Sequence, residues 1–155
     1  MNDSQIPDSA IKKRIQEDAN NALKAGEKFQ LGVLRLILSS IKQYEVDNRK
    51  LINDKNVLLV LEKMVKQRKE AIIQFKQGNR IDLVEKETKE ISILKEYLPE
   101  QLDELTTDKL IDQIIIKLDA NSLKDMGKVM KELQDQAQGR IDMKLASEKI
   151  KNILQ

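Results

Sequence analysis

The stretch ILKEYLPEQL, residues 93–102, divides this chain into two parts. Val84 and Ile91, which precede it, and Leu98 inside it repeat at a spacing of seven, as apolar residues on one face of a helix do. Pro99 stops that helix, because its ring removes a backbone donor and clashes with the preceding turn. We therefore expect a flexible N-terminal arm over 1–8, an N-terminal helical domain over 9–98, a linker over 99–106 and a C-terminal domain over 107–155.

Four helices are predicted before Pro99. The second is apolar on nearly every side between Leu31 and Ile41, which is typical of a central helix packed by several neighbours. Asp8 or Ser9 can cap the first helix, and Asn53 or Asp54 can cap the third. The predicted helices span about 9–25, 29–47, 55–76 and 81–98.

Three shorter helices are predicted after Pro99, over about 108–118, 122–138 and 142–154. Thr106 or Thr107 is expected to cap the first of them. The composition agrees, because Lys, Glu, Leu, Ile, Gln and Asp dominate while only 3% of the residues are aromatic. The fold class is therefore all-α, with an N-terminal bundle of about four helices followed by a C-terminal three-helix domain.

The composition also limits the catalytic and metal-binding groups that the chain can provide. The 155 residues include no cysteine and no histidine, which removes thiolate nucleophiles, the commonest general base and the commonest metal ligand. No phosphate-binding glycine loop is visible, so we expect no catalytic residue, no metal and no cofactor. We expect no membrane span and a cytoplasmic location, because the most apolar stretch is too short to cross a bilayer and contains Arg35.

A cationic set in the C-terminal part is the main candidate site. Lys124, Lys128 and Lys131 are spaced by four and three, so they should share one helix face. Small residues beside cations would let a polyanion backbone come close, whereas the alternative is that Gly127 admits a neighbouring helix and the lysines are merely solvated. The C-terminal candidate set consists of Lys124, Gly127, Lys128, Lys131, Gly139, Arg140 and Lys144.

A second basic set lies on the third predicted helix, at Lys63, Lys66, Arg68 and Lys69. It could meet phosphates, but a solvated face with Glu62 and Glu70 as local partners is the favoured interpretation. Two interpretations are also possible for Arg35, which lies inside the apolar second helix. It is either a functional cation in a groove or, as we favour, the partner of a carboxylate on a neighbouring helix.

Several segments together resemble the GatB/YqeY family. They are LRLILSSIK (34–42), QRKEAIIQFKQGNRIDLVEKE (67–87), ILKEYLPEQL (93–102), SLKDMGKVM (122–130) and the pair Gly139-Arg140. The resemblance covers nearly the whole chain from about Ile11. The family's DMGKVM glycine and lysine match Gly127 and Lys128, whereas Ile141 and Met143 depart from the small residues that usually follow the GR pair.

The resemblance implies a two-part helical fold similar to the C-terminal region of the B subunit of the glutamine-dependent aspartyl/glutamyl-tRNA amidotransferase. That region lies beside the tRNA and does not contain the catalytic centre. The leading expectation is therefore a non-catalytic module that binds tRNA or another structured RNA, with amidotransferase or aminoacyl-tRNA synthetase components as further possible partners. Two alternatives are an accessory role in carbon–nitrogen ligase activity with glutamine as amido-N-donor, and a helical protein–protein scaffold.

Overall fold

Seven α-helices and one 3₁₀ helix form the regular structure of the computed structural model, which describes residues Ser9–Gln155. The all-helical prediction is confirmed, since no strand occurs between these residues. The predicted arm over 1–8 lies outside the described residues. The chain divides into two compact units, Met1–Leu98 and Pro99–Gln155.

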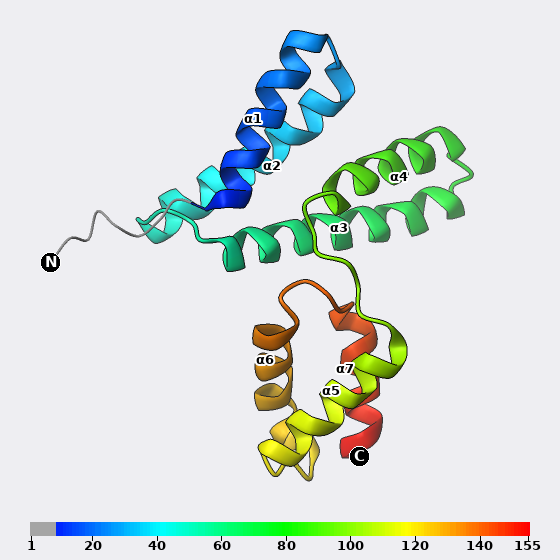
Figure 1. Ribbon diagram of the computed structural model, residues 1–155. Coiled ribbons are helices and arrows are strands. Elements are labelled where there is room, and N and C mark those ends of the chain that lie inside the picture. The colour runs from blue at the N-terminus through cyan, green and yellow to red at the C-terminus, as the bar shows by residue number, and fades with distance from the viewer. Residues whose placement is uncertain (1–8) are drawn as a thin grey trace, which may run out of the picture. The chain divides into compact units, whose positions relative to one another are not determined.

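The first unit contains two helical hairpins (Figure 1). Helices α1 (Ala10–Ala25) and α2 (Lys28–Asn48) form one hairpin, and α3 (Asp54–Gln77) and α4 (Ile81–Lys95) form the other. Ser9 and Asn53 cap α1 and α3 through their side chains, and each is one of the two cap residues expected for its helix. Gly26 ends α1 in the left-handed region, at φ 72°.

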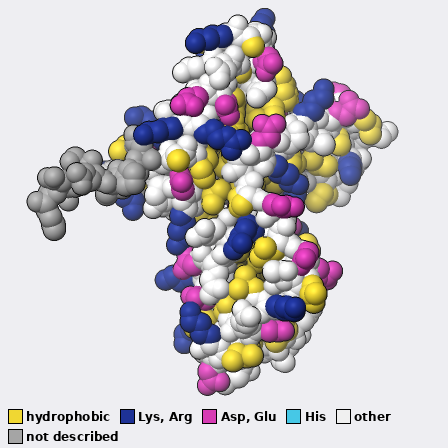
Figure 2. Space-filling model, viewed as in Figure 1, with side chains coloured by type: hydrophobic (Ala, Val, Ile, Leu, Met, Phe, Trp, Pro, Cys, Tyr) yellow, Lys and Arg dark blue, Asp and Glu magenta, His cyan; other side chains and the backbone are white. Residues whose placement is uncertain are grey.

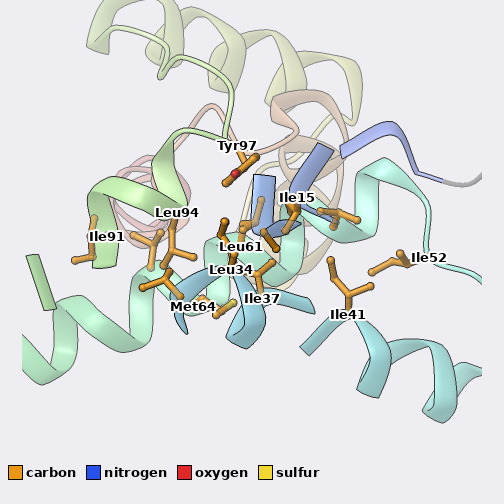
Figure 3. Packing of buried hydrophobic residues seen from close by; sticks show 14 of the residues in the cluster. Ile15, Leu34, Ile37, Ile41, Ile52, Leu61, Met64, Ile91, Leu94 and Tyr97 are labelled. Carbon is orange, nitrogen blue, oxygen red and sulfur yellow. The ribbon is translucent and has the colours of Figure 1, made fainter. Parts of the chain in front are cut away.

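All four helices contribute to one apolar core (Figure 3). Ile15 of α1, Leu34 and Ile37 of α2, Leu61 of α3 and Leu94 of α4 are completely buried. Burying a side chain of this size stabilises a fold by about 1.5–3 kcal/mol. The apolar second helix predicted from the sequence is thus placed in the middle of the unit, in contact with its neighbours.

Helix α4 is shorter than predicted. It ends at Lys95 rather than at Leu98, and the next three residues form a tighter turn with hydrogen bonds from residue i to residue i−3. The cause is Pro99, which disfavours the α conformation of the residue before it. Tyr97 is buried in this turn, where its hydroxyl donates to Asp18 Oδ2 at 2.6 Å.

A partly buried ion pair also stabilises the first unit. Lys12 Nζ lies 2.9 Å from Glu45 Oε2, which also accepts a hydrogen bond from the backbone N–H of Ile52 at 3.0 Å. Burial by itself would raise the pKa of Glu45, but these two donors hold that pKa below its usual value. The pair therefore links the start of α1 to the end of α2 and to the loop before α3.

The second unit contains α5 (Glu104–Lys117), the 3₁₀ helix η2 (Leu123–Asp125), α6 (Met126–Ala137) and α7 (Met143–Leu154). Its core is aliphatic and separate from that of the first unit. Ile111 and Ile114 of α5 meet Val129 and Leu133 of α6 and Ile150 of α7, and all five are buried.

Helix α5 begins earlier than predicted, inside the expected linker. Asp103 is its cap, with Oδ1 accepting from the backbone N–H of Thr106 at 2.7 Å. The expected caps are therefore wrong: Thr106 and Thr107 lie inside the helix, and the Thr107 hydroxyl donates to the Asp103 carbonyl at 2.8 Å. Aspartate and threonine are both good cap residues, and the extended backbone of Asp103 decides between them.

Candidate nucleic-acid interface

Three of the four lysines of the C-terminal candidate set, Lys124, Lys128 and Lys131, are exposed and lie on η2 and α6. Lys128 and Lys131 are three residues apart on α6, so they share one face of that helix. Lys124 belongs to the preceding 3₁₀ turn, so the single α-helical face expected for all three lysines is interrupted there. Among residues Ser9–Gln155, no side-chain hydrogen bond or ion pair occupies any of these three amines.

Gly127 is the second residue of α6 and is exposed. A Cβ atom added at this position would meet no atom within 4 Å, so no neighbouring helix of the described chain approaches it. Among the described residues, the structure therefore gives no support to the interpretation that Gly127 admits a neighbouring helix. The open space beside Gly127 lies next to Lys128 and near the positive end of the α6 dipole, where negative charge is stabilised.

Gly139 and Arg140 have a clear structural role. Gly139 has a φ of 84°, and its carbonyl accepts a hydrogen bond from Gln101 Nε2 at 2.7 Å. The Arg140 carbonyl accepts from the backbone N–H of Leu102, also at 2.7 Å. These bonds fasten the segment after Pro99 to the turn between α6 and α7, and we refer to them as the backbone clamp.

The guanidinium of Arg140 points back to the end of α6. Its Nε donates to the Ala137 carbonyl and its Nη2 to the Gln136 carbonyl, each at 2.9 Å. Cations at a helix C-terminus satisfy free carbonyls and complement the dipole. Arg140 is half-buried in this position, whereas Lys144, in the first turn of α7, is exposed. No local pattern in the sequence indicates that residues 93–102 and Gly139-Arg140 meet through Gln101 and Leu102.

The second basic set does not form one uniform face. Lys63, Lys66 and Lys69 are exposed on α3, and Lys69 takes part in an interaction within the chain. Arg68 is largely buried, and its Nε lies 3.0 Å from Glu90 Oε2 and 4.0 Å from Glu87 Oε2. Both carboxylates belong to α4, so Glu62 and Glu70 are not the partners of this arginine as the sequence suggested.

Arg68 lies beside two carboxylates, those of Glu87 and Glu90. Glu90 is buried at 7% exposure, and Glu87 lies close to it. Burial first, and then the neighbouring Glu90 carboxylate, raise the pKa of Glu87 above its usual value. Arg68 thus holds together two acids that would otherwise repel each other, and this role is structural.

Charges of both signs are interspersed over the face shown in Figure 2. No helix among the described residues is both long and apolar enough to cross a membrane. In the same residues, no three acidic side chains gather in a way that could hold a metal ion. The exposed cations of the C-terminal candidate set are Lys124, Lys128, Lys131 and Lys144, and these are the ones that an anionic partner can reach.

Several known proteins are similar to this chain. An uncharacterized protein of Schizosaccharomyces pombe is 36% identical over 101 residues, which cover 64% of this chain and 79% of that protein. A Pyrenophora tritici-repentis protein called altered inheritance of mitochondria protein 41, mitochondrial, is 26% identical over 151 residues, or 96% of this chain and 83% of its own length. Its Kluyveromyces lactis namesake is 38% identical over 84 residues, or 54% of this chain and 45% of its own length.

The family comparison covers nearly the whole chain. The model of the family described as Yqey-like protein matches residues 12–154, which include all seven α-helices except the first two residues of α1. This match agrees with the segments that carried the resemblance in the sequence. The chain belongs to the YqeY-like family.

Proposed function

We propose that this protein is a non-catalytic module that binds tRNA or another structured RNA through its second unit. The observation that carries the proposal is the cluster of Lys124, Lys128 and Lys131 beside the open backbone of Gly127. Each of these amines is free of intramolecular partners within Ser9–Gln155, so none must break an ion pair before it meets a phosphate.

The expected mode of binding is backbone recognition. The second unit contains no Phe, Tyr or Trp, so it has no aromatic ring on which a base could stack. Affinity would come from lysine–phosphate contacts and from the shape of a folded RNA. Lys144 would extend the contact, whereas Arg140 and Gly139 would act indirectly, by fixing the turn between α6 and α7.

The non-catalytic part of the proposal is supported by the lack of histidine and cysteine, which removes the commonest general base and the thiolate nucleophile. Support for the amidotransferase connection comes from the resemblance, and an accessory role in carbon–nitrogen ligation remains the alternative. We propose a site of action close to translation. The cytoplasmic location predicted from the sequence stays a prediction, because two relatives carry the word mitochondrial in their names.

A titration of folded tRNA at several salt concentrations tests the proposal. The double variant Lys128→Ala/Lys131→Ala should bind more weakly, and its salt slope should fall by about 0.7–0.9 for each lost phosphate contact. The matched control is Lys109→Ala/Lys151→Ala, which removes two exposed lysines from the same unit. Absence of binding at low salt, or equal weakening in the two double variants, would show that the proposal is wrong.

A further inference from the structure

A hollow of about 400 Å³ lies on the surface of the first unit, between α1 and α2. The two helices form an antiparallel hairpin, and both contribute to the lining, which consists of Gln16, Ala19, Asn20 and Leu23 of α1 and Leu31, Arg35 and Leu38 of α2. On both helices the lining positions recur every three or four residues. The hollow is therefore an elongated groove that follows the hairpin.

The lining combines leucines with hydrogen-bond donors. Leu23, Leu31 and Leu38 supply apolar surface, and Leu23 is 57% exposed to solvent. The polar members are the amides of Gln16 and Asn20 and the guanidinium of Arg35, and no carboxylate lines the groove. Such a lining suits an apolar partner surface that also carries a hydrogen-bond acceptor.

Arg35 is the only charged residue among the groove's lining side chains. The sequence favoured a structural ion pair for it, but no described residue supplies a carboxylate to its guanidinium. Guanidinium groups recognise carboxylates through paired, directional hydrogen bonds. An arginine set among leucines, without an internal acid, is thus complementary to an external one.

Gly32 supplies a separate observation. It lies inside α2, where glycine lowers helix stability by about 1 kcal/mol relative to alanine. A Cβ at this position would meet nothing within 4 Å, so packing inside the described chain does not require glycine here. Gly32 precedes Arg35 by three residues and so lies beside it on the helix surface. A missing side chain at this place permits the close approach of another backbone.

We propose that this groove binds an amphipathic helix of a partner protein, with an Asp or Glu of that helix paired to Arg35 and its apolar residues against Leu23, Leu31 and Leu38. An amphipathic helix in an apolar groove is a common mode of protein recognition. RNA fits the groove less well, because the lining offers one cation and no aromatic ring. The inference is independent of RNA binding by the second unit.

The test uses a displayed library of 14-residue amphipathic helical peptides, with every amino acid allowed at the central position. Selection on the full chain should enrich Asp or Glu at that position. The variant Arg35→Glu should bind the selected peptides about tenfold more weakly, a factor that corresponds to about 1.4 kcal/mol. Selection on this variant should enrich Lys or Arg instead. Lys89→Glu is the matched control, since it reverses an exposed charge on α4 of the same unit.

Two further variants separate docking from folding. Leu23→Lys changes an exposed side chain and should weaken peptide binding while the helical circular dichroism signal stays unchanged. Gly32→Leu should block close approach and weaken binding by about tenfold, a factor that corresponds to about 1.4 kcal/mol. The proposal is overturned if no peptide is enriched, or if Arg35→Glu and Lys89→Glu bind equally well. It is also overturned if sedimentation shows that the groove variants abolish self-association, because the occupant is then a second copy of this chain.

Discussion

The interactions that stabilise the first unit internally differ from those that stabilise the second. In the first, ion pairs such as Arg68–Glu90 are largely removed from water, and a mixed core includes the buried ring of Tyr97. In the second, the buried core residues are all aliphatic, the ion pairs are more exposed, and the carbonyls of Gly139 and Arg140 accept the hydrogen bonds of the clamp. The difference shows where mutations should matter: removing one partner of a largely buried ion pair in the first unit should cost stability, whereas removing one partner of an exposed ion pair in the second should not.

Truncation of a core side chain should produce the largest loss of stability. It should also show whether the two units unfold independently. Leu34→Ala should destabilise the first unit by about 2–5 kcal/mol, because it leaves a cavity at a fully buried site. Both tyrosines, Tyr44 and Tyr97, belong to that unit, so tyrosine fluorescence during urea unfolding reports on it alone. Leu133→Ala should change the circular dichroism transition but leave the fluorescence transition in place. A shift of both signals in both variants would mean that the units unfold as one.

Removal of a buried cation should come next in size. Arg68→Ala should cost about 3 kcal/mol, because the buried carboxylate of Glu90 loses its compensating charge. Lys149→Ala should have no measurable effect, since its partners Glu104 and Asp108 are exposed on α5. Urea unfolding of the two variants checks this contrast. Equal effects would contradict the distinction between structural and surface charges.

Replacing Gly139 or Gly32 by alanine should change the free energy of unfolding in opposite directions. Gly139→Ala should destabilise the second unit by about 1–2 kcal/mol, because a φ of 84° is unfavourable for an L-residue and the clamp depends on it. Gly32→Ala should stabilise the first unit by about 0.5–1 kcal/mol, since alanine is the better helix former and has free space there. Thermal unfolding measures both. Destabilisation by Gly32→Ala would reveal an intramolecular requirement for glycine at that position.

The smallest effect should be the contribution of Glu45 to the pH dependence of stability in the first unit. The folded state lowers the pKa of Glu45, so its stabilising contribution is complete above the unfolded value of about 4.5. That contribution is lost as the pH falls through the lower, folded pKa. Glu45→Gln should therefore flatten the decline of stability between about pH 5 and pH 3. An unchanged acid limb, followed by tyrosine fluorescence, would contradict this role.

Much of the fold could be read from the sequence, because local signals and packing agree. The apolar spacing of the helices, the side-chain caps at Ser9 and Asn53, and the stop at Gly26 all reappear in the structure, whereas α4 ends three residues before the predicted end at Leu98. The candidate lysines are exposed as expected, since the opposite face of α6 carries Val129 and Leu133 into the core. These features depend on residues that are close together in the chain.

Other features needed tertiary structure. The sequence predicted Thr106 or Thr107 as the cap of α5, but the cap is Asp103. All three residues are acceptable caps, and only the backbone conformation distinguishes them. The partners of Arg68 lie 19 and 22 residues away on α4, and no local pattern pairs them. The clamp joins Gln101 to Gly139 across 38 residues.

The helical character of the chain and the bounds of most of its helices can thus be predicted from the order of residues alone. The support that Arg140 gives to the end of α6, and the position of Arg35 in a groove without a described acid, become visible only once the chain is folded. The two kinds of feature differ in the distance along the chain over which their interactions act. Helix propensity and capping act within a few residues, whereas ion pairs and grooves depend on which distant side chains the fold brings together.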